Sequence, residues 1–433
     1  MTKQTSIILF IGWILLNMLT SCGSKSNSHK SKSEENTSEL KIEKDTMVVI
    51  TDRFIESIAK YDYVGEFSEG LAYFKKNNNN GFINTKGEEV ILCDCDRAES
   101  FHSGFAMIEK DHKYGLINKK GEIVVPCIYN LRIYNFHSDL AVTCKNGLYG
   151  CINQLGETII PFIYSSIEGF SEGLCAVEKD GKWGYVNNKG ELVITPKYIK
   201  ARNFHDGLAS VENNGKWGVI NNHGETVIPF TYFDIDNFSD GLASAKIDDK
   251  WGYINKKGEK VIPFIYDYAC EFHEGVAHVR KDNKTGYINI HGQEICPFKY
   301  AAGGDFSDGL AGVVYEEWDE GTYMYRRYHG FINKKGEEVI PCMYESSSGE
   351  PFSEGLVPMM KDGKWGYINS QNKVIIPFIY DSAFKFSQGL AKVRKNGIEG
   401  FVDKNGKDTF YGEEYVKKVE QRIKEEQIST WDE

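Results

Sequence analysis

Beyond its first 21 residues, the chain lacks any apolar run that approaches the roughly 18 residues of a membrane span. It also lacks an excess of positive charge. The formal net charge is −11, and such an acidic surface argues against nucleic acid as the main partner. Proline is scarce, with 10 residues, whereas glycine (43), tyrosine (25) and phenylalanine (25) are abundant. This balance is typical of many short strands joined by tight turns.

The common signatures of catalysis and metal binding are missing as well. No Ser-His-Asp order, glycine-rich phosphate loop or isolated pair of carboxylates stands out, so we expect no enzymatic activity and no cofactor. The turns rich in asparagine and aspartate lack the dense carboxylate spacing of calcium loops. Cys93-x-Cys95 has no second pair at a zinc-binding spacing, so we expect no metal site.

The N-terminal segment has the organisation of an export signal. Lys3 precedes an apolar run at residues 7–16, which is too short for a comfortable transmembrane helix. The Leu-Thr-Ser-Cys sequence ending at Cys22 resembles the lipobox of bacterial lipoproteins, whose cysteine is acylated after cleavage just before it. The resemblance implies a signal peptide at 1–21 and a durable lipid anchor at Cys22. An ordinary signal peptide or an uncleaved anchor is the alternative.

Residues 22–46 are almost free of apolar side chains after the cysteine, which predicts a flexible tether. The resemblance to lipoproteins implies a location in the cell envelope. Gly23 favours the outer membrane under the sorting rule of some enterobacterial lipoproteins. Whether the protein faces the periplasm or the cell surface stays open.

Three short motifs then recur with a period of 34 residues over most of the chain. They are Phe-[Ser/His]-x-[Gly/Asp]-[Leu/Phe/Val], an aromatic residue followed by glycine, and Val-Ile-Pro-Phe-x-Tyr. Ten copies in register predict a tandem repeat over residues 67–410. We expect a degenerate half repeat at 47–66 to cap one end. A charged segment at 411–433, apolar at every fourth position, predicts a helical cap at the other end.

The pattern within one unit is that of a β-meander. Asp180-Gly181 lies between two apolar runs, which predicts a hairpin turn with both residues at positive φ, and Gly190 supplies the left-handed residue of a longer turn. We therefore expect three short strands and an irregular link per unit. The expected architecture is all-β, with the units in an elongated, solenoid-like or superhelical array. A closed propeller-like ring is the alternative; ten blades would be many, and 34 residues is short for four strands.

Four units contain Lys-Trp-Gly followed by Tyr or Val, at Trp183-Gly184, Trp217-Gly218, Trp251-Gly252 and Trp365-Gly366. These residues resemble the WG, or KWG, repeat family, and the resemblance covers about residues 60–410. It implies an all-β tandem array found in many bacterial proteins and no particular chemical activity. All ten units keep the glycine, although six lack the tryptophan, which indicates that backbone geometry or close approach matters there. We predict that the aromatic columns form the core, with glycan-stacking platforms as the alternative.

Nine cysteines remain besides Cys22, and an odd number leaves at least one of them without an intramolecular partner. Most replace apolar residues of the repeat and should behave as small hydrophobic side chains. The disulfide pairing stays open.

One unit carries an insertion of ten residues within a single hairpin. A type II′ turn at Gly321-Thr322 would restore the register. The resulting pairs are Tyr315–Tyr328, Glu316–Arg327, Glu317–Arg326 and Trp318–Tyr325. The insertion would form an arm projecting by roughly 16 Å, or a flap lying on the next repeat. Because the arm concentrates residue types enriched at binding hot spots, we predict that it holds the partner-binding residues. These are Trp318, Tyr323, Tyr325, Arg326 and Arg327.

We therefore expect a non-enzymatic interaction scaffold, anchored in the cell envelope through acyl chains on Cys22, that binds a protein partner. A glycan-binding module is the second hypothesis. An envelope hydrolase is a distant third, because it would require a cluster of polar residues that occurs once and off the repeat pattern. The sequence does not identify the protein or glycan that is bound.

Overall fold

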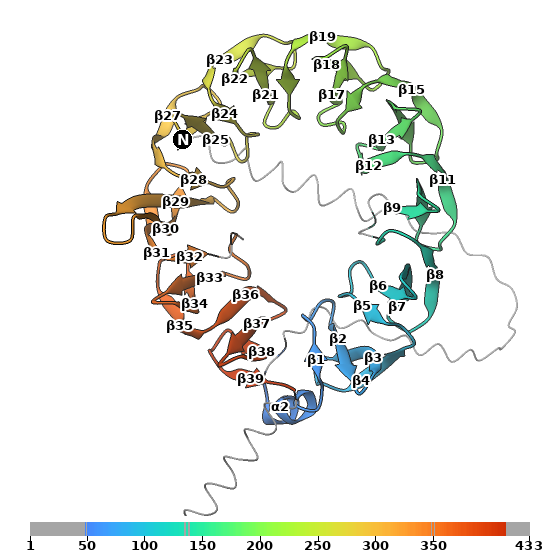
Figure 1. Cartoon of the computed structure of the whole chain (residues 1–433), viewed down its shortest axis with the longest axis vertical. Coiled ribbons are helices and arrows are strands. Elements are labelled where there is room, and N and C mark those ends of the chain that lie inside the picture. Colours follow the sequence, from blue (N-terminus) through green and yellow to red (C-terminus); the bar gives the residue numbers. More distant parts are fainter. Residues whose placement is uncertain are drawn as a thin grey trace, which may run out of the picture. The chain divides into compact units, whose positions relative to one another are not determined.

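The computed structural model describes residues 48, 50–133, 136, 139–347, 349 and 351–412, which form a ring of ten small antiparallel sheets (Figure 1). The predicted signal peptide, the anchor at Cys22, the tether and residues 413–433 lie outside the described residues. Within the described part, no helix has the length and hydrophobicity needed to cross a membrane. We number the sheets as blades 1 to 10 in chain order.

The first five blades contain the following strands. Blade 1 is β1 (Tyr63–Val64), β2 (Leu71–Lys76), β3 (Asn79–Asn84) and β4 (Glu89–Cys93). Blade 2 is β5 (Arg97–Ala98), β6 (Phe105–Lys110), β7 (Lys113–Asn118) and β8 (Ile123–Tyr129). Blade 3 is β9 (Leu140–Lys145), β10 (Leu148–Asn153) and β11 (Thr158–Tyr164). Blade 4 is β12 (Ser166–Ser171), β13 (Leu174–Lys179), β14 (Lys182–Asn187) and β15 (Leu192–Tyr198). Blade 5 is β16 (Lys200–Ala201), β17 (Leu208–Asn213), β18 (Lys216–Asn221) and β19 (Thr226–Tyr232).

The remaining blades repeat this order. Blade 6 is β20 (Asp234–Ile235), β21 (Leu242–Ile247), β22 (Lys250–Asn255) and β23 (Lys260–Tyr266). Blade 7 is β24 (Tyr268–Ala269), β25 (Val276–Lys281), β26 (Lys284–Asn289) and β27 (Glu294–Tyr300). Blade 8 is β28 (Ala302–Gly303), β29 (Leu310–Asp319), β30 (Met324–Asn333) and β31 (Glu338–Tyr344). Blade 9 is β32 (Ser346–Ser347), β33 (Leu356–Lys361), β34 (Lys364–Asn369) and β35 (Val374–Tyr380). Blade 10 is β36 (Ser382–Ser387), β37 (Leu390–Lys395), β38 (Ile398–Asp403) and β39 (Asp408–Phe410).

The predicted elongated array is wrong, and the alternative of a closed ring is confirmed. The expected irregular link contains a fourth strand, which lies at the inner edge of the blade, while the last strand lies at the outer rim (Figure 1). In most blades the inner strand has two residues and the outer strand seven. Most blades are therefore wedges, and wedges that taper toward the same side bend the array around until its ends meet.

The predicted turns are confirmed. Asp180 and Gly181 have φ values of 54° and 72°, as a two-residue hairpin turn requires. Gly190, in the longer turn, has φ of 79°. Asn372, which replaces the glycine of this turn in blade 9, also adopts a left-handed conformation, with φ of 59°.

The hydrophobic cores lie between neighbouring blades, as predicted for the aromatic columns. Between blades 4 and 5, Tyr185 packs edge-on against Phe204 with ring centroids 4.8 Å apart. Trp217 and Trp251 are buried, with 7% and 8% of their surface exposed. Trp183 and Trp365 pack against the cores at their margins and stay partly exposed, so the prediction of a buried tryptophan holds fully for two of the four units.

The glycine of the Trp-Gly pair is required by close approach. A Cβ atom on Gly252 would lie 2.7 Å from the carbonyl oxygen of Ile262 in the outer strand of the same blade. Equivalent clashes occur at Gly184, Gly218 and Gly366. The register between the third and fourth strands shifts at this point, as between Trp251 and Tyr253, and brings the backbones together.

Every blade is made from a continuous segment, so the ring closes through side chains, a backbone hydrogen bond and one helix and not through a shared sheet. Helix α2 (Asp52–Ile58) lies beside β39 and β1 (Figure 1). Val48 N donates to Gln388 O at 2.8 Å, and the hydroxyl of Tyr411 donates to Val64 O at 2.9 Å. The segment at 47–66, predicted to cap one end, therefore joins the first blade to the last. Tyr411, predicted to begin a helix, is buried and non-helical at this junction.

Candidate functional site

Two positions at the inner edge of the blade change from copy to copy. One follows the short first strand, and the other is the third residue of the second strand. Their backbones are hydrogen-bonded, as from Gly65 N to Tyr73 O at 2.8 Å and from Asp236 N to Ser244 O at 2.9 Å. We call these two residues the inner pair of a blade. The described inner pairs joined in this way are Gly65/Tyr73, Glu99/Met107, Arg202/Ser210, Asp236/Ser244, Cys270/His278 and Gly304/Gly312.

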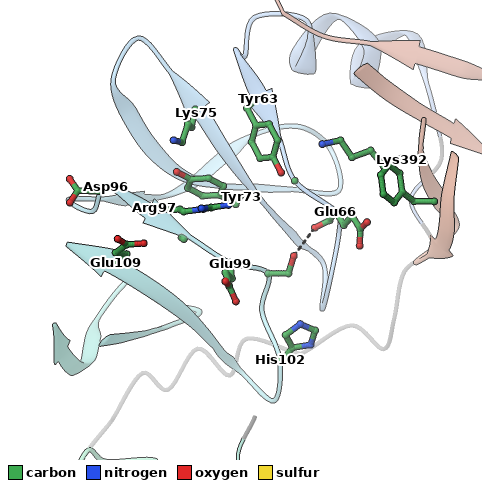
Figure 2. Close-up of a pocket in the computed structure, with 14 residues that line it drawn as sticks. Tyr63, Glu66, Tyr73, Lys75, Asp96, Arg97, Glu99, His102, Glu109 and Lys392 are labelled. Carbon is green, nitrogen blue, oxygen red and sulfur yellow. Dashed lines mark hydrogen bonds between the residues drawn. The ribbon is translucent and has the colours of Figure 1, made fainter. Parts of the chain in front are cut away.

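A pocket of about 880 Å³ lies where the ring closes, between blades 1, 2 and 10 (Figure 2). Inner-pair residues Gly65, Tyr73 and Glu99 line it, together with Phe384 and Lys392 at the equivalent positions of blade 10. Because Gly65 has no side chain and its neighbours do, the pocket follows from differences between copies of the repeat.

The pocket offers aromatic faces to a ligand. Tyr63 and Phe384 are 37% and 50% exposed. The ring of Tyr63 lies 6.2 Å from that of Tyr73, and the ammonium of Lys392 lies 4.4 Å from the Tyr63 centroid. Burial raises the pKa of Tyr73 to about 12, so this phenol stays protonated, and its hydroxyl donates to Asn80 Oδ1 at 2.9 Å.

Charges of both signs surround these aromatic faces, as Figure 2 shows. Glu99 pairs with Arg132 at 2.9 Å, and Lys392 pairs with Glu399 at 2.8 Å. The remaining charged or titratable side chains of the lining are Glu66, Lys75, Asp96, Arg97, His102 and Glu109. Such a lining can hydrogen-bond a polar ligand through donors and acceptors at once. No group of three or more potential metal ligands is found in the described part of the chain.

A polar belt continues along the inner edges of blades 5 and 6. Arg202 Nη1 lies 2.7 Å from Asp236 Oδ1, and Ser244 Oγ donates to Asp236 Oδ2 at 2.8 Å. Burial raises the pKa of Asp236 against the opposing effect of Arg202. The belt reaches blade 7, where the inner pair is Cys270 and His278.

A second pocket, of about 530 Å³, lies between blades 8 and 9. The inner pair of blade 8 is Gly304 and Gly312, and the space that side chains fill in other blades is open here. Asp305 and His329 contribute polar atoms to the lining. Both pockets therefore depend on the inner pairs.

The arm in blade 8 has the predicted register. Tyr315 faces Tyr328, Trp318 faces Tyr325, and the two intervening pairs also match the prediction. The predicted type II′ turn is wrong. The left-handed residue is Tyr323, with φ of 54°, and its N–H donates to Asp319 O at 2.9 Å. The Asp319 carboxylate accepts hydrogen bonds from Gly321 N and the Thr322 hydroxyl, which favours this wider four-residue turn.

The arm extends beyond the outline of the ring (Figure 1). Its predicted binding residues are exposed. Tyr323 is 78% exposed, and Trp318 and Tyr325 form an edge-on pair with centroids 5.0 Å apart. Arg326 Nε donates to Asp319 Oδ2 at 2.6 Å, and Arg327 lies 3.8 Å from Glu316. The structure thus brings the five predicted residues together on one projecting hairpin.

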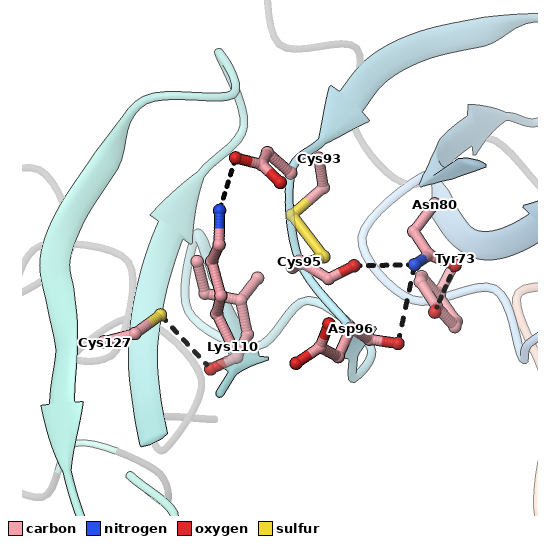
Figure 3. Close-up of a disulfide and its surroundings, with 9 residues drawn as sticks. Tyr73, Asn80, Cys93, Cys95, Asp96, Lys110 and Cys127 are labelled. Carbon is pink, nitrogen blue, oxygen red and sulfur yellow. Dashed lines mark hydrogen bonds and ion pairs between the residues drawn. A yellow bond between two sulfur atoms is a disulfide. The ribbon is translucent and has the colours of Figure 1, made fainter. Parts of the chain in front are cut away.

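Among the described residues one disulfide is present, between Cys93 and Cys95 (Figure 3). Asn80 Nδ2 donates to Cys95 O at 2.6 Å. Asp94, the residue between the two cysteines in the sequence, forms an ion pair with Lys110. Seven other cysteines of the described part are free, most of them at the apolar positions predicted for them: Cys127, Cys144, Cys151, Cys175, Cys270, Cys296 and Cys342.

Comparison with solved structures gives chains of low similarity. A eukaryotic initiation factor shares 12% identity over 69% of this chain and 93% of its own, with a TM-score of 0.46. Kluyveromyces lactis Hsv2 shares 9% identity over 64% of this chain and 99% of its own, with a TM-score of 0.28. The dihydro-heme d1 dehydrogenase NirN shares 12% identity over 64% and 74%, with a TM-score of 0.34. No curated protein matches the sequence.

A family profile described as "WG containing repeat" matches ten segments of the sequence. They are residues 58–79, 81–114, 114–149, 149–183, 183–217, 217–251, 251–284, 286–317, 330–365 and 365–397. These segments cover most of the ten blades and skip much of the arm. The chain therefore belongs to the WG-repeat family, and its repeats form the blades of a closed β-propeller ring.

Proposed function

We propose that this protein is an interaction scaffold, anchored by lipid on Cys22 in the outer membrane, whose arm binds a protein partner. The exposed aromatic and guanidinium groups of the arm carry this proposal. Large aromatic side chains and arginine supply much of the binding energy at protein interfaces. Tyr323 is 78% exposed, so it adds nothing to the hydrophobic core of the ring.

The test replaces residues 315–328 by Lys-Asp-Gly-Lys, the sequence of the equivalent turn at 179–182 in blade 4. The ring core does not include the arm, so the melting temperature should stay within a few degrees of the parent. Crosslinking in intact cells from a photoreactive residue at position 323 should capture one defined protein. A Trp318→Ala variant should lose most of that crosslink, whereas Phe233→Ala, which removes an exposed aromatic ring elsewhere, should keep it.

A shortened protein that melts well below the parent and keeps its partner would show that the arm is structural. The anchor is tested separately. Cys22→Ala should abolish metabolic labelling with a fatty acid and release the protein from the membrane fraction. Unchanged labelling and detergent partitioning in this variant would contradict lipid attachment at Cys22.

Glycan binding is the second candidate, and the pocket at the ring closure favours it. Tyr63 and Phe384 present exposed aromatic faces next to several carboxylates, an arrangement suited to stacking and hydrogen bonding with a sugar ring. Calorimetric titration with soluble cell-wall fragments tests this candidate. Binding that is lost in Phe384→Ala and kept in the arm-shortened protein would assign the glycan to the pocket; no heat with any fragment would remove the candidate.

A further inference from the structure

The inner pair of blade 7 combines a thiol and an imidazole. Cys270 follows β24 and His278 is the third residue of β25, with Cys270 N donating to His278 O at 3.2 Å. The side chains meet as well, because Cys270 Sγ lies 2.8 Å from His278 Nε2. Cys270 is a free and partly exposed thiol.

A carboxylate from the next blade completes a line of three groups. Asp305, which follows β28, places Oδ1 3.2 Å from the other ring nitrogen of His278, Nδ1. Its second oxygen lies 3.6 Å from His273 Nε2. Burial alone would lower the pKa of His278, but Asp305 and Cys270 outweigh it and raise the pKa to about 9. The imidazole of His278, 3.2 Å away, holds the pKa of Asp305 below the ordinary value.

This arrangement differs from a metal site. The two nitrogens of one imidazole point in divergent directions, so the sulfur on one side and the carboxylate on the other cannot converge on one ion. The order of the three groups is instead that of sites with a thiol nucleophile, in which the thiol lies next to one imidazole nitrogen and a carboxylate next to the other. Here Cys270 lies next to Nε2 and Asp305 next to Nδ1.

Among the blade residues that the structure describes, the cluster also occurs once. The equivalent inner pairs of blades 5 and 6 are Arg202/Ser210 and Asp236/Ser244, and neither contains a thiol or an imidazole. The polar groups of blade 6 pair with one another and with Arg202, as a structural belt would. Blade 7 therefore differs from blades 5 and 6 because its inner pair is a thiol and an imidazole, and the imidazole lies beside a carboxylate.

We propose that Cys270, His278 and Asp305 form a nucleophilic thiol site that cleaves acyl esters or thioesters. This activity goes beyond the binding function of the arm. With the proton of the pair on His278, Cys270 Sγ would bond to the acyl carbon, while the carbon–oxygen or carbon–sulfur bond of the substrate breaks. The leaving alcohol or thiol would take the proton from His278. Water would then hydrolyse the thioester on Cys270, releasing a carboxylic acid and restoring the thiol.

A pocket borders the carboxylate end of this line of residues. Asp305 also lines the second pocket, of about 530 Å³, which the glycines of blade 8 leave open. Its wall contains the apolar side chains of Phe306, Leu310 and Phe352. At the other end of the line, Tyr268 lies close enough to Cys270 for the charge of the sulfur to raise the pKa of its phenol.

The test uses the full chain and p-nitrophenyl acetate as the probe. The parent should release p-nitrophenolate, and peptide mass spectrometry after a short reaction should find the acetyl group first on Cys270. Cys270→Ala and His278→Gln should each slow the release by about a hundredfold, the scale of a lost nucleophile or general base. Cys342→Ala, which removes another partly exposed thiol that has no imidazole partner in the described structure, should react like the parent.

Acetylation of other cysteines or of lysines before Cys270 in the parent would overturn the proposal, and this measurement needs no variant to fold. Release at the parent's rate by Cys270→Ala would overturn it too. The arm-shortened protein should keep the esterase activity, and Cys270→Ala should keep the crosslink from position 323. The two proposals can therefore fail independently.

Discussion

At the residue scale, Gly252 shows why the Trp-Gly glycine occurs in every repeat. A methyl group there would meet Ile262 O at 2.7 Å and Phe264 N at 2.9 Å. Both neighbours are backbone atoms of the outer strand and cannot rotate away. We predict that Gly252→Ala lowers the free energy of unfolding by about 1–3 kcal/mol, as overpacking does.

Urea unfolding followed by tryptophan fluorescence checks this prediction. Gly169→Ala is the matched control, since a Cβ atom there meets nothing within 4 Å. Equal effects at the two positions would mean that the glycine is retained for a reason other than close approach.

The tryptophans of the repeat should contribute unequally. Trp217 is buried between blades 5 and 6, and the guanidinium of Arg202 lies 4.9 Å from its ring centroid. Trp217→Ala should cost about 3–5 kcal/mol, the scale of a large buried aromatic residue. Trp365, at the margin of its core, should cost clearly less. Thermal unfolding of the two variants measures the difference, and a larger loss for Trp365→Ala would contradict the burial order.

The inner pairs carry a signal that was available in the sequence. Several repeats read Gly-[Leu/Val]-Ala-x-[Val/Phe] at the second strand, and x is Tyr73, Ser210, His278 or Lys392 in different copies. This residue varies from copy to copy while its neighbours change little, so it makes the inner edge of one blade chemically different from that of the next. The pairing of Cys270 with His278 and the distance to Asp305 were not readable in the same way, because they depend on how blades 7 and 8 pack.

At the scale of the element, one asparagine organises the turn between the third and fourth strands. In blade 4, Asn187 Oδ1 accepts hydrogen bonds from Lys189 N and Glu191 N, both at 3.0 Å, and Asn187 Nδ2 donates to Glu191 Oε2 at 2.7 Å. In blade 10, Asp403 accepts the same two backbone bonds, and Lys407 replaces the glutamate. Because both residues are exchanged together, each turn keeps one hydrogen-bond donor and one acceptor side chain: an amide with a carboxylate in blade 4, and a carboxylate with an ammonium group in blade 10.

A double-mutant cycle tests this coupling. Asn187→Asp should cost about 1–2 kcal/mol, because two carboxylates then face each other and one hydrogen bond is lost. Adding Glu191→Lys should recover most of the loss, since it recreates the combination of blade 10. Chemical denaturation of the parent, both single variants and the double variant gives the coupling energy. Additive losses would mean that the two side chains act independently.

The arm separates what its sequence could determine from what it could not. Alternating aromatic and charged pairs determined the register, because one register alone sets Glu316 against Arg327 and Trp318 against Tyr325. The turn depended on the Asp319 carboxylate, which binds the turn backbone. That competing local hydrogen bond moved the left-handed residue from the predicted glycine to Tyr323.

At the scale of the whole molecule, closure of the ring was the part that periodicity could not reveal. A repeat of 34 residues specifies the contact between neighbours, and the same contacts build an open or a closed array. Closure follows from small rotations summed over ten blades and from the segment around α2. Phe67 of blade 1 packs against Phe401 of blade 10 at 5.9 Å, and Ser387 Oγ donates to Phe67 O at 2.9 Å.

The most direct test of this account measures distances between the hairpin turns of the second and third strands. Spin labels introduced through an unnatural amino acid avoid the ten cysteines of the chain. Three pairs join position 78 in blade 1 to 112 in blade 2, 248 in blade 6 and 396 in blade 10. Electron–electron double resonance should give a 78–396 distance close to that of 78–112 and well below that of 78–248. A 78–396 distance longer than the other two would contradict the closed ring.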